Sequence, residues 1–185
     1  MKLGLAGIVG VAVGGAVGAG SASAIARLGR PTPRRFAFFT DSEAALLIDI
    51  CEQIIPDDDV PGATQTGAIH YIDRKLCGVF KRHQQAYRRG LESFRQTCLR
   101  EHGVPFESLT AAAKIDALRA IEAGRAPREL WSDPTPQEFF GLVLAHTMQS
   151  FYGSPRHGGN RDYASYRMLG IDYPPVVGRN RPRRG

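Results

Sequence analysis

Few side chains in this sequence combine the types and the spacing that catalysis or metal binding requires. Asp57, Asp58 and Asp59 offer clustered carboxylate oxygens of the kind that a hard cation such as calcium prefers. They lack the alternating ligands and the closing glutamate of an EF-hand loop, so we interpret them as a solvated turn. His70 and Asp73 stand three residues apart on a predicted helix with no nucleophile beside them, so we expect this pair to orient a partner or a loop. We therefore predict no catalytic residue, no cofactor-binding residue and no metal ligand in this chain.

The cysteines form no haem or metal motif. Cys51, Cys77 and Cys98 contain no C-x-x-C pair, which excludes a covalent c-type haem and a four-cysteine iron-sulfur pattern in this chain. All three fall on predicted helix faces that point inward, which favours buried free thiols. If the chain is exported, a disulfide between two of the three is the alternative, and the sequence does not choose the pair. His146 lies on an apolar helix face, where we expect a hydrogen-bonded core histidine.

A stretch near the C-terminus combines aromatic, arginine and glycine residues. Gly153 suits a helix C-terminus, while Gly158 and Gly159 permit a positive φ or close approach by another backbone, so we expect an ordered loop. It is not a phosphate-binding loop, because it lacks Gly-Lys-Ser/Thr and does not pass from a strand to a helix. Aromatic and arginine side chains on a shaped loop are typical of interface hot spots, although such a loop can equally pack on its own domain. The candidate partner-interface residues are Tyr152, Gly153, Pro155, Arg156, Gly158, Gly159, Asn160 and Arg161, and further aromatic and arginine residues follow at Tyr163, Tyr166 and Arg167.

Helical periodicity places these residues on an all-α domain. Capping boxes at Thr40-Asp41-Ser42-Glu43 and Thr135-Pro136-Gln137-Glu138 each open an apolar helical pattern. No run of residues has the alternation of a strand, so we predict a compact bundle of about five helices with an ordered, Gly-rich C-terminal loop region. The five patterns cover residues 41–55, a face from Ile69 through Val79 to Phe80, residues 82–102, residues 109–123, and the segment from the second capping box to Tyr152.

The formal net charge of +6 belongs to the chain termini. All 18 acidic residues lie between Asp41 and Asp172, and residues 36–178 carry 15 basic and 18 acidic residues, a net charge of −3. Residues 27–39 are predicted to be a linker, residues 40–175 the helical domain, and residues 176–185 an arginine-rich tail. Because the body is not basic, nucleic acid is not an expected partner.

The N-terminal segment is predicted to direct export. Residues 3–26 contain no charge, and Ala22-Ser23-Ala24 supplies the small residues that a signal peptidase reads, so residues 1–26 are either an export signal or an uncleaved membrane anchor. The glycine content and the cleavage site favour the signal. Lys2 followed by a weakly hydrophobic, glycine- and alanine-rich run resembles the end of a twin-arginine signal without its arginine pair. Our hypothesis is that the start codon lies upstream and that the motif is truncated here.

Five short motifs, in a fixed order, carry a resemblance to a known family over residues 40–175. They are Ile54-Ile55-Pro56-Asp57, Pro61-Gly62-Ala63, Tyr71-Ile72-Asp73, Phe151-Tyr152-Gly153-x-Pro155 and Gly158-Gly159-Asn160-Arg161-Asp162. Together they resemble the gluconate 2-dehydrogenase subunit 3 family. The family usually has a tyrosine before the paired glycines and Gly-Trp after them, where this chain has His157 and Ala164-Ser165-Tyr166. These departures indicate a divergent branch whose partner would oxidise another sugar or alcohol.

The resemblance implies a non-catalytic small subunit of a membrane-associated dehydrogenase. Its large partner would be an FAD-dependent flavoprotein of the glucose-methanol-choline oxidoreductase type, and its third partner is commonly a multihaem cytochrome c. FAD would then lie in the large partner and haem c in the third subunit, with no cofactor in this chain. We expect this chain to be periplasmic, to reach the membrane through the complex, and to stabilise and co-export the flavoprotein, which must cross the membrane already folded around its FAD.

Two other functions are consistent with the sequence. An independent enzyme would need a nucleophile, a metal site or a cofactor site, and the sequence offers none. A stand-alone envelope protein would bind anionic membrane through the basic termini of the chain.

Overall fold

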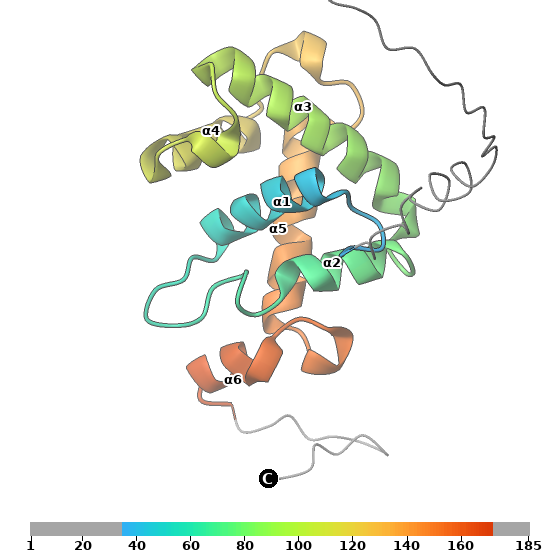
Figure 1. The fold of residues 1–185 in the computed structure, drawn as a ribbon, viewed down its shortest axis with the longest axis vertical. Helices are drawn as coiled ribbons and strands as arrows, with labels where there is room; N and C mark the ends of the chain where they lie inside the picture. The colour runs from blue at the N-terminus through green and yellow to red at the C-terminus, as the bar shows by residue number, and fades with distance from the viewer. Residues whose placement is uncertain (1–34, 172–185) are drawn as a thin grey trace, which may run out of the picture. The chain divides into compact units, whose positions relative to one another are not determined.

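The computed structural model describes residues 35–171, and this part of the chain consists of helices without a β-strand, which confirms the all-α prediction (Figure 1). The predicted export signal 1–26, most of the predicted linker 27–39 and the predicted tail 176–185 lie outside the described residues. The α-helices are α1 (Asp41–Ile54), α2 (Ala68–Leu76), α3 (Gln84–His102), α4 (Ala111–Glu122), α5 (Pro136–Tyr152) and α6 (Ala164–Met168). In the described part, 3-10 helices lie at Lys81–His83, Phe106–Ser108, Arg128–Leu130, Pro155–His157 and Arg161–Tyr163.

The two capping boxes start α1 and α5 where the sequence predicts them. The Thr40 side chain accepts the Glu43 backbone N–H at 3.2 Å, and the Glu43 carboxylate accepts the Thr40 backbone N–H at 2.8 Å. Thr135 and Glu138 repeat this arrangement at the start of α5, with Pro136 as its first residue. Each box satisfies backbone donors that a helix start otherwise leaves without a partner. All five predicted helices are present in the structure as α1 to α5, and the short α6 is an additional helix.

The second predicted helix is shorter than its apolar pattern suggests. We predicted an inward face that includes Val79, but α2 ends at Leu76 and the Val79 side chain is 67% exposed. The chain turns at Gly78, where the N–H groups of Gly78 and Phe80 both bind the carbonyl of Lys75. This turn directs Phe80 back onto the core and leaves Val79 in solvent, so the prediction for Val79 is wrong.

The end of the predicted linker is part of the folded domain. Phe36 and Phe39 are only 3% and 4% exposed, which contradicts a linker that extends to residue 39. The reason is the buried carboxylate of Asp73 on α2, which accepts three backbone N–H groups, from Ala37 at 2.8 Å, Phe38 at 2.9 Å and Phe39 at 3.1 Å. The expectation that Asp73 orients a loop is confirmed, and the loop is the segment before α1. The domain therefore begins at least as early as Phe36.

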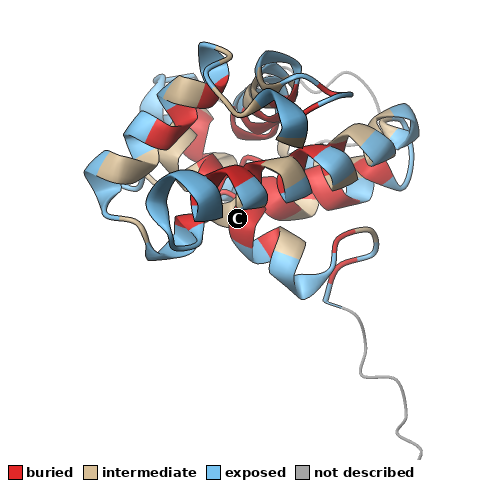
Figure 2. Ribbon diagram, turned by 90° about the horizontal axis from the view of Figure 1, so that it is seen from above, coloured by how far each residue is buried: buried red, intermediate tan, exposed pale blue. Residues whose placement is uncertain are grey.

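The helix α5 runs through the middle of the described domain, and all the other α-helices pack against it (Figure 1). Its buried side chains point to several sides at once, because α1, α2, α3, α4 and α6 surround it. The outer helices are buried on one face and exposed on the other, as the red and pale blue stripes along the ribbon in Figure 2 show. This arrangement is typical of a helical bundle built around one central helix.

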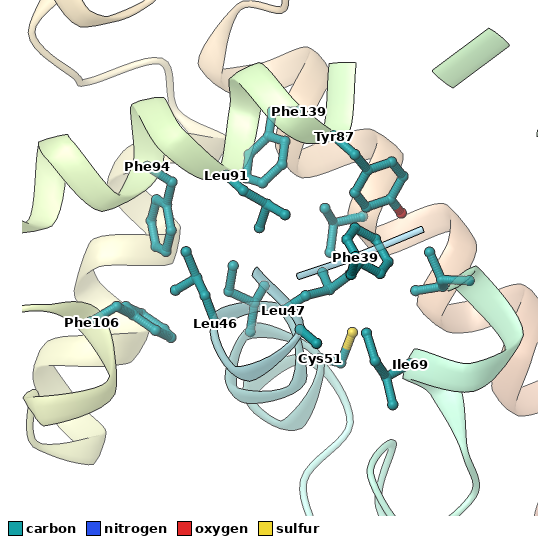
Figure 3. Close-up of a cluster of buried hydrophobic side chains, with 14 of the residues drawn as sticks. Phe39, Leu46, Leu47, Cys51, Ile69, Tyr87, Leu91, Phe94, Phe106 and Phe139 are labelled. Carbon is teal, nitrogen blue, oxygen red and sulfur yellow. The ribbon is translucent and has the colours of Figure 1, made fainter. Parts of the chain in front are cut away.

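Aromatic and aliphatic side chains from α1 and α3 fill the space in front of α5 (Figure 3). Phe94 of α3 packs against Phe106 with ring centroids 5.0 Å apart, and Phe139 of α5 packs against Trp131 at 5.8 Å. Gly90 lets α3 approach α5 closely, because a Cβ at this position would overlap the Phe139 ring. The contact between α3 and α5 therefore depends on a residue without a side chain.

His146 of α5 is buried, which confirms that it is a core histidine. Its Nδ1 atom lies 3.0 Å from the Tyr87 hydroxyl, and its ring stacks on Phe80 with centroids 4.0 Å apart. Burial, together with the nearby charges of His83 and Arg82, lowers the pKa of His146 from 6.5 to about 4. The imidazole is therefore neutral in the folded domain at neutral pH.

The close approach at Gly90 predicts opposite effects for two glycine substitutions in helices. Gly90→Ala forces a methyl group into the Phe139 ring and should lower the free energy of unfolding by about 1–3 kcal/mol. Gly141→Ala is the matched control, because Gly141 lies in α5, is exposed and has open space around it. It should stabilise the domain by roughly 0.5–1 kcal/mol through helix propensity. Urea unfolding of both variants checks this, and equal effects would contradict the close contact.

The buried His146 predicts a loss of stability in mild acid. A folded-state pKa below the unfolded value means that the unfolded chain binds the proton more readily. The stabilisation is therefore complete above about pH 6.5 and is lost as the pH falls toward about 4, by at most about 1.4 kcal/mol per pH unit for this group. Urea unfolding between pH 7 and 5 should show the decline, and His146→Leu should flatten it. An unchanged pH dependence in that variant would assign the decline to other groups, such as His70, His83 and His157, whose pKa values are also lowered.

Candidate partner-binding surface

The loop after α5 is held in shape by Asn160. This side chain is fully buried, and its amide donates a hydrogen bond to the carbonyl of Gly153 at 2.9 Å while its carbonyl accepts the N–H of Ser165 at 3.0 Å. Asn160 has a left-handed backbone with φ of 44°, a conformation that asparagine tolerates better than most residues. The next residue, Arg161, donates its N–H to the carbonyl of Thr66 at 3.1 Å. One side chain therefore closes the loop between α5 and α6, and the adjacent backbone ties it to the residues before α2.

The paired glycines of the loop serve two different purposes. Gly158 has a φ of +97°, in the left-handed region that the sequence analysis expected. Gly159 is buried against the end of α5, because a Cβ there would overlap the hydroxyl and the carbonyl of Ser150. Gly159 and Asn160 were predicted as partner contacts, and their burial corrects this expectation. They position the loop and are not available to touch a partner.

Other predicted interface residues are exposed. Tyr152 is 42% exposed, and the side chains of Arg156 and Arg161 are exposed as well, whereas Gly153, Pro155 and Gly158 are half-buried. Met168 at the end of the short α6, and Leu169 and Ile171 after it, are exposed apolar side chains that were not predicted, since an apolar pattern this short has no recognisable period. We call the following exposed side chains the loop surface: Tyr152, Arg156, Arg161, Arg167, Met168, Leu169 and Ile171.

The fold brings basic residues of α2 beside this loop. A Cβ at Gly158 would lie 2.7 Å from Nη1 of Arg74, and a Cβ at Gly67 would lie 3.5 Å from Nη2 of Arg161. The pKa of His157 is lowered by its partial burial and by the nearby charges of Lys75 and Arg156. Arg74 and Lys75 were not predicted to lie near the loop, because they precede it by about eighty residues in the sequence and carry no motif of their own.

The acidic turn at residues 57–59 is organised by Glu52 of α1. The Glu52 carboxylate accepts the N–H of Asp57 at 2.9 Å and the N–H of Thr64 at 3.0 Å, and the Asp58 carboxylate accepts the N–H of Val60 at 3.1 Å. These bonds close the loop between α1 and α2. Within residues 35–171 there is no group of three or more histidine, cysteine, aspartate or glutamate side chains placed to hold a metal ion. No helix in the same range is both long and apolar enough to span a bilayer.

A hollow of about 600 Å³ lies between the last turns of α3 and α4. Phe94, Cys98 and Ile121 form its apolar floor, and the Arg100–Glu129 ion pair lies at its rim. The hollow shares no residue with the loop surface. Its mixed, open lining presents no convergent set of polar groups of the kind that fixes the orientation of a small ligand.

The cysteines differ from the expectation that all three face inward. Cys51 and Cys98 are buried, but Cys77 is exposed, because it lies just beyond the last turn of α2. All three are free thiols in the structure. The Cys51 sulfur lies 3.2 Å from the Thr147 hydroxyl, and burial raises the pKa values of Cys51 and Cys98 to about 12.

Thiol labelling should separate the three cysteines. In the native protein a thiol reagent should modify Cys77 alone, since burial and a raised pKa keep Cys51 and Cys98 protonated and inaccessible. After denaturation without a reductant it should modify three thiols. Cys77→Ser removes the native signal and serves as the control. A single reactive thiol in the denatured, unreduced protein would instead establish a disulfide.

Comparison with known proteins identifies one protein family that matches the chain. A family model described as gluconate 2-dehydrogenase subunit 3 matches residues 41–172, which is the helical domain from the first residue of α1 to just past the described region. No curated protein and no solved structure matches the chain.

Proposed function

The chain belongs to the gluconate 2-dehydrogenase subunit 3 family, and on this premise we propose that it is the small, non-catalytic subunit of a periplasmic dehydrogenase complex. The catalytic subunit would be an FAD-dependent flavoprotein of the glucose-methanol-choline type that oxidises gluconate, another sugar or an alcohol. A multihaem cytochrome c would be the third subunit. The family match over residues 41–172 is the observation that carries this proposal.

The loop surface is the contact that we propose for the flavoprotein. It combines an exposed aromatic ring, three arginines and the apolar side chains of Leu169 and Ile171, which are 53% and 47% exposed. Tyrosine and arginine dominate the binding energy of many interfaces, and apolar side chains beside them lose water on contact. The buried Asn160 and Gly159 keep these side chains in place, so little conformational entropy would be lost on binding.

Export is the second part of the proposal. Residues 1–26 would direct this subunit through a pathway for folded proteins, and the flavoprotein would cross the membrane with it. Deletion of residues 1–26 should leave both proteins in the cytoplasm. A flavoprotein that still reaches the periplasm would refute the carrier role without affecting the subunit assignment.

Co-purification tests the subunit assignment. A C-terminally tagged chain purified from membranes should bring down a protein with a flavin absorption spectrum and dye-linked dehydrogenase activity. The double variant Tyr152→Ala/Leu169→Asp should lower the recovered flavin by about tenfold or more, as expected for the loss of about 1.4 kcal/mol or more at an interface.

The control variant for this experiment is Val79→Asp. Val79 is 67% exposed and lies outside the loop surface, so this change alters a comparable side chain without touching the proposed contact. Flavin recovery with Val79→Asp should equal that of the wild type. Absence of flavin from the wild-type preparation, together with salt-sensitive binding to anionic vesicles, would contradict the assignment and favour the stand-alone envelope protein.

A further inference from the structure

We propose that an arginine cluster between α2 and the loop after α5 binds an acidic segment of the dehydrogenase subunit. The cluster consists of Arg35, Arg74 and Arg161, with Lys75 and Arg156 beside them. The identity of the partner rests on the proposed function, whereas the chemistry of the ligand, a chain of carboxylates, rests on the cluster itself.

The contact between Gly67 and Gly158 brings two of the arginines together. A Cβ on Gly67 would lie 3.4 Å from the carbonyl of Gly158, so the start of α2 and the loop touch at these glycines. The Arg161 guanidinium lies on the Gly67 side of this contact and the Arg74 guanidinium lies on the Gly158 side. Two cationic groups from distant parts of the sequence therefore flank one backbone contact.

Arg35 joins them through the segment before α1. The bonds from Asp73 to the backbone of residues 37–39 hold this segment on α2, and Phe36 stacks on His70 with ring centroids 5.5 Å apart. The Arg35 guanidinium lies 5.4 Å from the centroid of the Phe36 ring. Partial burial lowers the pKa of His70, and the nearby charges of Arg161, Arg35 and Arg74 lower it further, while Asp73 acts in the opposite direction.

The cluster has no counter-ion within residues 35–171. None of Arg35, Arg74, Lys75, Arg156 and Arg161 forms an ion pair there, although six other basic side chains do, for example Arg88 with Glu43 and Lys114 with Asp49. The carboxylate of Asp73, the neighbour of Arg74 in the sequence, is occupied by three backbone N–H groups. The carboxylate of Asp162, the neighbour of Arg161, forms no ion pair with the cluster.

Bringing like charges together without a counter-ion costs free energy in the isolated domain. On binding, the carboxylates of a partner would offset the repulsion between these positive charges.

An acidic protein segment fits the cluster better than a lipid headgroup does. The guanidinium fork binds carboxylates through two parallel hydrogen bonds, and the cations are spread over α2, the loop and the segment before α1, as an extended ligand requires. The exposed ring of Tyr152 precedes the same loop and supplies the aromatic contact that protein interfaces favour.

The first test measures retention of the flavoprotein on the tagged full chain. Arg74→Gln/Arg161→Gln should lower the retained flavin by about tenfold and weaken its decline between about 50 and 300 mM salt. Arg125→Gln/Arg128→Gln is the matched control, because both arginines are exposed and form no ion pair within residues 35–171, and it removes the same charge. Urea unfolding should show that neither variant is less stable than the wild type.

The second test uses the purified chain and an octaglutamate peptide, with inorganic phosphate and phosphatidylglycerol vesicles as comparisons. The peptide should raise the pKa of His70 in an NMR titration, because carboxylates offset the arginine field, and Arg74→Gln/Arg161→Gln should abolish the shift. Equal peptide binding by that variant, or tighter binding of vesicles or phosphate than of peptide, would overturn the inference. A wild-type chain that binds the peptide but retains no flavoprotein would refute the proposed function and leave the carboxylate chemistry of the cluster standing.

Discussion

The described domain depends on the central position of α5, because this helix is the one surface that all the other α-helices share. A helix enclosed in this way must satisfy its polar side chains internally. His146 does so through Tyr87 of α3, and the Thr147 hydroxyl does so through the carbonyl of Val143 at 2.8 Å. The Ser150 hydroxyl has no hydrogen-bond partner within the described part of the chain, and it lies under Gly159. The end of α5 thus carries a polar group that the loop covers, and only a glycine leaves room for both.

A single buried carboxylate links the fold to the surface. Asp73 ties the backbone of residues 37–39 to α2, which seats Phe36 and Phe39 in the core and places Arg35 beside His70. Hydrogen bonds from neutral donors to an ionised acceptor are stronger than neutral ones, and three of them satisfy most of what a buried carboxylate requires. The same interaction therefore stabilises the core and sets the position of one cation of the arginine cluster.

Structural features that arise from residues close together in the sequence could be predicted correctly. Features that arise from contacts between distant segments could not. Both capping boxes follow from local chemistry, and the structure has them. Val79 was misassigned because the turn at Gly78 breaks the helical period one residue earlier. The predicted linker was too long because the apolar run Phe36-Ala37-Phe38-Phe39 precedes the first capping box and is too short to show a helical pattern. Only the distant Asp73 explains why Phe36 and Phe39 are buried. The basic residues of α2 could not be connected to the loop without the contact between Gly67 and Gly158.

In the loop after α5, some residues stabilise the fold and others are exposed at the surface. Asn160 and Gly159 are buried and hold the backbone, so their replacement changes the fold first and any binding second. The arginines are exposed and form no ion pairs with the described residues, so their replacement removes repulsion from the free domain and attraction from a complex. These two groups of residues alternate along one short segment, and neither composition nor motif distinguishes them. The buried residues therefore fix the shape of the loop, while the exposed arginines add no ion pair with the described residues to the stability of the domain.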